Sequence, residues 1–327
     1  MKRLVMRWEV LLLGLLVLEL VVFGAINPRF LKLSSLLYGT SDFVHVGIVA
    51  VPLTLVIIAG GIDVSFASTV GLCAITFGIA NFFGMPLAVS LAVGFATGAL
   101  AGLLNATIIR LTRLQPLVVT LGALYMFSGA ATVLSGVVGA NGYDGIGGFP
   151  AAFTGLGYQM ILGLPMPLFV FLAFSLVMLV LLHVTRFGRL VFQIGQNESA
   201  ARHAGMPVAR VQLLTYVITG LAAALAGLLL SAYFGSARVD LGKATLLPAI
   251  TAAVLGGASI YGGQGSVIGT IIATFIIGYL QQGLQMSGVP SQVSSALSGA
   301  LLVVVVAMRH GASLLREFIP VRPRPSE

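Results

Sequence analysis

Side chains that could do chemistry are sparse in this sequence and lie far apart. The single cysteine is Cys73, and the four histidines stand alone at His45, His183, His203 and His310, so no group has the spacing of a metal site. The one Gly-Lys pair is followed by Ala244, which does not match the phosphate-binding loop of ATPases. No nucleophile lies in a recognisable set with a base. We therefore expect no enzymatic activity, no metal and no cofactor.

The most polar stretch near the middle of the chain is GQNESAARHAGMP, residues 195–207. Asn197 is a favoured N-cap residue, and Glu198 would lie at the positive end of the helix dipole. Gly205 suits the left-handed position after a helix, and Pro207 prevents continuation. The pattern predicts a helix of about two turns. Because so short a helix is unstable alone in water, it needs a surface to lie on, and the membrane face is one such surface.

Asp63 and Ser65 could line a path for a polar solute. They follow the glycine pair Gly60 and Gly61 and precede an apolar run that begins near Val64. A carboxylate in this position could orient a solute or respond to a partner subunit. It could equally cap the next helix, which is the structural alternative.

A second polar group lies near the C-terminus. Gln281 and Gln285, with Gln282 between them, end one apolar run, and the next run opens with serines at 291, 294, 295 and 298. This i, i+3, i+4, i+7 spacing places the serines on one helix face. Ser294 and Ser298 could line a path or allow close helix packing, because both are small. An uncharged polar lining would suit a neutral, hydroxyl-rich solute.

The composition predicts that these residues are positioned by membrane helices. Hydrophobic residues make up 58% of the 327 residues and charged residues only 8%, against about 25% charged in soluble proteins. We predict an all-α polytopic membrane protein, with residues 1–327 as one transmembrane domain of about ten helices. The predicted spans are Trp8–Ala25, Phe43–Ala59, Val64–Phe83, Pro86–Ile109, Pro116–Val138, Pro165–Leu182, Val211–Ala232, Leu246–Ile260, Val267–Met286 and Val293–Met308. The spans that begin at residues 43, 246 and 293 are shorter than the roughly 20 residues of a full crossing, so they either extend through neighbouring small and polar residues or are broken helices.

The positive charges predict the orientation. With both termini in the cytoplasm, only Arg29, Lys32, Arg238 and Lys243 fall outside, and the remaining thirteen lysines and arginines fall inside. Inner loops of membrane proteins carry such an excess, so the net charge of +8 does not indicate nucleic-acid binding. Residues 186–210 then form a cytoplasmic loop and residues 139–164 an outer loop. Glu19, inside the first span, fits a functional and a structural role equally.

Four ordered stretches resemble the sugar-type permeases of ATP-binding-cassette (ABC) importers. They are LVIIAGGIDVSFAST (residues 55–69), PLVVTLGALYMFSGAATVLSG (116–136), TRFGRLVFQIGQNESAARHAGMPVARV (185–211) and PAITAAVLGGASIYGGQGSVIGT (248–270). Together they extend over most of the chain. The resemblance implies that residues 186–210 couple the permease to a separate ATPase. The coupling residues it implies are Glu198, Ala201, Arg202, Ala204 and Gly205.

Other stretches, such as SAYFGSARVDLG (231–242), are similar to the permeases of autoinducer-2 import systems within that family. The resemblance implies uptake of autoinducer-2 across a bacterial inner membrane, with ribose or another monosaccharide as the alternative. It also implies an ATPase, a second homologous permease in a heterodimer, a periplasmic binding protein docked near residues 139–164, and surrounding lipid. A transporter that works without ATP is a rival class, in which Glu19 and Asp63 would carry protons.

Overall fold

The computed structural model describes residues 2–140 and 144–290, together with a few residues between 293 and 307. The helices of these residues are accompanied by one short hairpin, whose two strands have two residues each. This agrees with the predicted all-α fold class. Six described helices are long and apolar enough to cross a membrane. They are α1 (Lys2–Ile26), α5 (Leu87–Thr112), α6 (Pro116–Val137), α8 (Met166–His183), α11 (Val208–Phe234) and α13 (Val267–Met286).

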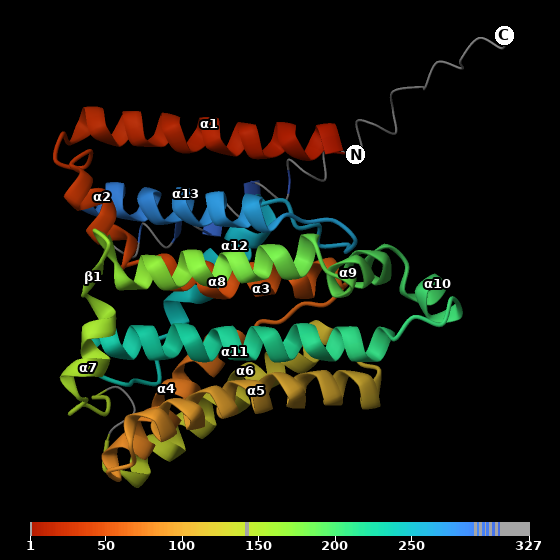
Figure 1. Cartoon of the computed structure of the whole chain (residues 1–327), viewed down its shortest axis with the longest axis horizontal. Helices are drawn as coiled ribbons and strands as arrows, with labels where there is room; N and C mark the ends of the chain where they lie inside the picture. The colour runs from red at the N-terminus through yellow and green to blue at the C-terminus, as the bar shows by residue number, and fades with distance from the viewer. Residues whose placement is uncertain are drawn as a thin grey trace.

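The central helix is α3 (Val44–Ile58), which is buried at fourteen of its fifteen positions. Its sequence is apolar all round, and such a helix is stable only when other helices surround it. The short helix α2 (Leu33–Thr40) precedes it, and the two axes bend by 55°, so together they form a seventh candidate span. In Figure 1, α3 and α8 overlap at one level of the view, with α13 above them and α11, α6 and α5 below.

Two further apolar helices are too short to count as spans by length. They are α4 (Phe66–Phe82) and α12 (Leu246–Leu255), the second preceded by the 3-10 turn η2 (Lys243–Thr245). The chain before η2 forms turns that lie against α4, because a Cβ on Gly71 would lie 2.2 Å from the carbonyl oxygen of Val239. Within the predicted span 246–260 only residues 246–255 are helical, so these residues do not form one continuous membrane helix.

Each of the first nine predicted spans contains one apolar helix of the described chain. The tenth, residues 293–308, lies almost wholly outside the described residues. Several helix pairs pack through glycines: a Cβ on Gly98 of α5 would lie 2.3 Å from the carbonyl oxygen of Gly220 on α11. Small residues allow membrane helices to approach this closely.

Short elements gather at the two ends of the bundle (Figure 1). One end carries α2, α7 (Ala151–Thr154), the 3-10 turn η1 (Gly155–Gly157) and the hairpin of β1 (Met160–Ile161) and β2 (Leu164–Pro165). The opposite end carries α9 (Arg186–Gln196) and α10 (Glu198–His203). The predicted coupling segment (α9 and α10) and the predicted outer loop (with α7 and the hairpin) thus lie at opposite ends of the bundle.

Candidate functional site

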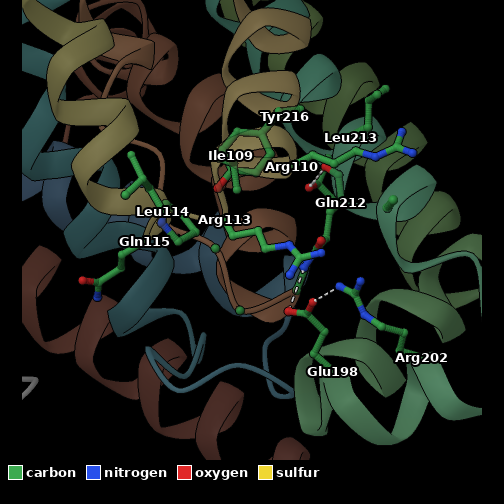
Figure 2. Close-up of a pocket in the computed structure, with 17 residues that line it drawn as sticks. Ile109, Arg110, Arg113, Leu114, Gln115, Glu198, Arg202, Gln212, Leu213 and Tyr216 are labelled. Atoms are coloured by element: carbon green, nitrogen blue, oxygen red, sulfur yellow. Dashed lines mark hydrogen bonds and ion pairs between the residues drawn. The ribbon is translucent and has the colours of Figure 1, made fainter.

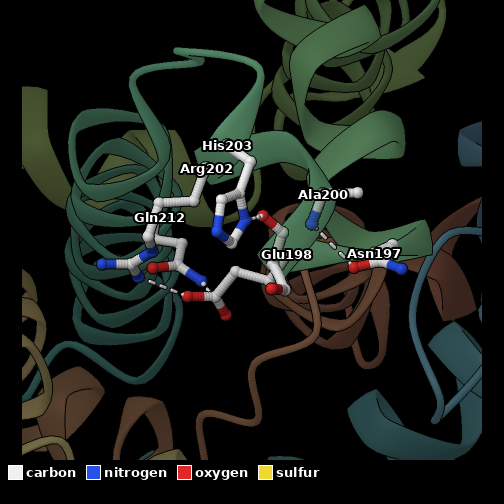
Figure 3. Close-up of polar contacts among 7 residues, drawn as sticks. Asn197, Glu198, Ala200, Arg202, His203 and Gln212 are labelled. Atoms are coloured by element: carbon white, nitrogen blue, oxygen red, sulfur yellow. Dashed lines mark hydrogen bonds and ion pairs between the residues drawn. The ribbon is translucent and has the colours of Figure 1, made fainter.

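The predicted short helix is present as α10, with the predicted capping residues. The Asn197 side-chain oxygen accepts a hydrogen bond from the Ala200 amide at 2.9 Å, and Asn197 also ends α9. Gly205 follows the helix with φ +74°, which favours glycine. The guanidinium of Arg202 pairs with Glu198 at 2.6 Å, one turn apart (Figure 3). The helix ends are therefore fixed by the local sequence.

Four of the five predicted coupling residues are exposed on the surface of the protein. Glu198, Arg202, Ala204 and Gly205 are exposed, whereas Ala201 is 4% exposed. Ala201 packs into the main hydrophobic core and holds the helix against the end of the bundle. A partner that docks on α10 would touch the other four residues, and Ala201 would support them from below.

A cavity of about 830 Å³ opens beside α10 (Figure 2). Glu198 and Arg202 line one side, and the C-terminal end of α5 lines the other with Arg110 and Arg113. The floor includes Tyr216 of α11 and the glycine pair after α3. The side chain of Gln212 donates to Glu198 at 3.2 Å across one edge. The cavity wall is thus polar and carries more positive than negative charge.

Asp63 and Ser65 lie in a buried hydrogen-bond network rather than on the cavity wall. Asp63 Oδ1 accepts from the amide of Ser65 at 2.9 Å and from its hydroxyl at 2.7 Å. The side-chain amide of Asn105 donates to the Ser65 hydroxyl at 2.7 Å, and Thr120 donates to the carbonyl of Ile62 at 3.1 Å. The network ties the start of α4 to α5 and α6. Asp63 is 2% exposed and Ser65 1% exposed, so neither meets an open path here.

Two opposing effects act on the Asp63 carboxyl. Burial raises the pKa of Asp63 above its ordinary value, because a charged group loses hydration. Hydrogen bonds from Ser65 and from the backbone of Phe66 favour the charged form and act in the other direction. Burial is the larger effect. The carboxyl is therefore held by donors from Ser65 and Phe66 at the start of α4.

The glutamines lie at the other end of the bundle. α13 begins beside the first turns of α1, where its N-cap Ser266 donates to Glu9, and it ends where Asn27 donates to the carbonyl of Met286. Gln281 is half-buried and Gln285 is exposed near this far end. The structure therefore does not bring them together with Asp63 and Ser65. Ser294 and Ser298 lie outside the described residues.

Several residues that shape these sites were not among the candidates predicted from the sequence. Asn105 is the one amide side chain in α5, and that was the available signal. Arg110 and Arg113 were counted only as topology charges, although they face the cavity. Among the described residues, no three His, Cys, Asp or Glu side chains are placed to hold a metal.

The fold and its sites define a multi-pass helical permease. Residues 35–306 match the family model described as branched-chain amino acid transport system / permease component, and the chain belongs to this family. It is therefore a transport subunit of the ABC type. A structure described as a metal-chelate type ABC transporter in an inward-facing conformation shares the fold, with a TM-score of 0.51, 17% identity and coverage of 93% of this chain and 99% of that chain.

Among curated relatives, the chain is similar to the autoinducer 2 import system permease protein LsrD of Escherichia coli strain K12. The two are 57% identical over 312 residues, which are 95% of this chain and 94% of the relative. LsrD of Shigella flexneri matches to the same extent. The similarity therefore extends over nearly the whole length of both proteins.

Proposed function

We propose that this protein is a permease subunit of an ABC importer that carries autoinducer-2 into the bacterial cytoplasm. The observation that carries the proposal is the 57% identity to the autoinducer 2 import permease over 95% of the chain. The matched region covers nearly the whole of both chains. The absence of a phosphate-binding loop in the sequence agrees with a division of labour in which another subunit hydrolyses ATP.

The proposed complex contains an ATPase subunit, a second homologous permease and a periplasmic solute-binding protein. In it, α10 and the loop 186–210 face the cytoplasm and receive the ATPase. Glu198, Arg202, Ala204 and Gly205 are exposed for this contact. The outer loop 139–164 would meet the binding protein. Both termini would be cytoplasmic, as the excess of positive charge at the inner side indicates.

For the solute path we propose polar positions at two depths, Asp63 with Ser65 and Gln281 with Gln285. Ser294 and Ser298 belong to the same proposal. An uncharged amide and hydroxyl lining can exchange hydrogen bonds with a hydroxylated solute as its water is removed. Because the Asp63 network is closed in this state, Asp63 would contribute only after α4 moves relative to α5.

Uptake of labelled autoinducer-2 tests this function. Cells that carry all subunits should accumulate the label, and deletion of this permease alone should abolish accumulation. Unlabelled autoinducer-2 should compete and ribose should not. Inactivation of the ATPase should stop uptake, whereas collapse of the proton gradient at constant ATP should not. Competition by ribose would assign a monosaccharide, and uptake that survives loss of the ATPase would favour the proton-coupled rival.

A further inference from the structure

Three glycines bring the segment before α10 into backbone contact with the centre of the bundle. Gly195 is the last residue but one of α9, and Gly262 and Gly263 lie in the loop between α12 and α13. A Cβ on Gly195 would lie 1.6 Å from the carbonyl oxygen of Ile58 and 2.6 Å from the amide nitrogen of Gly263. Atoms in a folded protein do not approach so closely, so a side chain at position 195 would force these segments apart.

The loop between α12 and α13 closes the contact from its own side. The amide of Gly263 donates to the carbonyl of Ile58 at 2.8 Å. Gly262 has φ +84°, and its Cβ would lie 2.7 Å from the carbonyl oxygen of Gly195. Three chain segments thus meet around the Ile58 carbonyl. We call this contact of Gly195, Gly262 and Gly263 with Ile58 the glycine junction.

Two of the three segments of the glycine junction lead into largely buried helices. Ile58 is the last residue of α3, the central helix. The loop joins α12 to α13, and these two helices are themselves in backbone contact, since a Cβ on Gly269 would lie 1.9 Å from the carbonyl oxygen of Gly256. A displacement at the junction would therefore reach α3, α12 and α13 together.

The third segment, α9, leads directly to α10. One residue, Asn197, separates the two helices and hydrogen-bonds into α10. At its other end α9 is pressed against α8, where a Cβ on Gly188 would lie 1.8 Å from the carbonyl oxygen of Leu182. Val191 and Ile194 are buried in the core. The short link gives α9 and α10 little freedom to move separately.

Two other contacts link α10 to the bundle. Ala201 packs into the main hydrophobic core and holds α10 in place. The Gln212 side chain donates to Glu198 at 3.2 Å in an exposed position. An exposed pair of long side chains can rotate and exchange partners with water, so it transmits little displacement. Close-packed backbone has no such freedom, because packed interiors are stiff.

We propose that the glycine junction transmits a displacement of α9 and α10 to the central helix α3 and to the α12–α13 loop. Gly195 is a positioning residue in this device, since only glycine lets the three backbones touch. The inference rests on the proposed coupling role of α10, and it adds the route that the movement takes through the permease.

The test compares junction variants with matched glycine variants in the full complex. Gly195→Ala inserts a methyl group at the contact, and Gly14→Ala does the same on α1, where nothing lies within 4 Å. Gly262→Ala adds contact and positive-φ strain, whereas Gly84→Ala adds strain alone, because φ is +76° with open space. The controls therefore separate loss of contact from general effects of alanine.

The first readout is solute carried per ATP hydrolysed by the purified complex. Gly195→Ala and Gly262→Ala should lower this ratio at least tenfold while the ATPase still co-purifies and hydrolyses ATP. The controls should keep the ratio of the unchanged complex. A parallel fall in transport and hydrolysis, an unchanged ratio, or failure of both junction variants to assemble beside normal controls would each overturn the proposal. If Gln212→Ala lowers the ratio and the junction variants do not, the displacement passes through the contact between Gln212 of α11 and Glu198 of α10 instead.

A second readout needs no transported solute. In a Cys73→Ala background, Leu33→Cys places a thiol at the start of α2, where Leu33 is 71% exposed. α2 is tied to α13 because Gln282 donates to the carbonyl of Ser35 at 3.0 Å. Trapping the ATPase with a non-hydrolysable nucleotide should change the labelling rate in the controls but not in Gly195→Ala. An equal nucleotide effect in all variants would refute transmission, whatever the substrate proves to be.

Discussion

At the scale of single residues, the polar side chains of this permease act mainly by holding backbone in place. Asp63 accepts two hydrogen bonds from Ser65, and Asn105 reaches the same hydroxyl from α5. These bonds are buried among apolar helices, where an unsatisfied donor is costly. The main role of the Asp63 carboxyl is therefore to accept hydrogen bonds, and its charge is of secondary importance.

This view predicts different outcomes for two substitutions of Asp63. Asp63→Asn keeps a side-chain oxygen and should retain assembly and most transport. Asp63→Ala removes the acceptor from both Ser65 donors, which costs about 1–3 kcal/mol for a buried group. Thermal unfolding of the purified permease should show a lower midpoint for alanine than for asparagine. If asparagine is as destabilising as alanine, the charge and not the acceptor is what the fold requires.

At the scale of elements, α10 could be predicted from the sequence because each of its boundaries has its own residue. Asn197 caps the start and Gly205 allows the turn that follows. The short run at residues 246–260 left open whether the helix is extended or broken, and the sequence could not decide between these alternatives, because the end of α12 at Leu255 depends on how the chain packs. The glycine contacts were hidden for the same reason, because a glycine does not show which backbone it will meet.

The same reasoning predicts how α10 responds to substitution. A Cβ on Gly205 would meet nothing within 4 Å, so any strain there comes from φ alone. Gly205→Val places a β-branched residue in the left-handed region, at a cost of about 1–2 kcal/mol. Gly205→Asn is the matched control, because asparagine tolerates this region. Solute uptake and co-purification of the ATPase with the permease should fall for Gly205→Val and should be retained for Gly205→Asn.

Bulk on the exposed face of α10 gives a complementary test. Ala204→Trp should obstruct docking of the ATPase without disturbing the bundle, because Ala204 is exposed. A connector that only rests on the membrane would accept this change, since tryptophan suits a membrane interface. Normal co-purification and uptake for Ala204→Trp would therefore restore the connector interpretation.

At the scale of the whole molecule, the two ends of the bundle differ in charge and in shape. The end with α9 and α10 contains the cavity edged by Arg110, Arg113 and Arg202. The opposite end contains the β1–β2 hairpin (Figure 1). In the loop that follows α11, Arg238 pairs with Asp240 at 3.0 Å. An excess of lysine and arginine on the cytoplasmic side is the usual pattern in membrane proteins. The charge count of the sequence therefore favours the proposed orientation, with α10 in the cytoplasm.

Cysteine accessibility tests this orientation with one probe at each end. Cys73 is buried and is the only cysteine, so Cys73→Ala provides a clean background. Ser199→Cys lies on the exposed surface of α10. Leu162→Cys lies in the turn of the β1–β2 hairpin, where Leu162 is 91% exposed. An impermeant thiol reagent should label Leu162→Cys in intact spheroplasts and Ser199→Cys only in inverted vesicles. The reverse pattern would place α10 outside, where no ATPase could reach it, and would remove the basis of the coupling proposal.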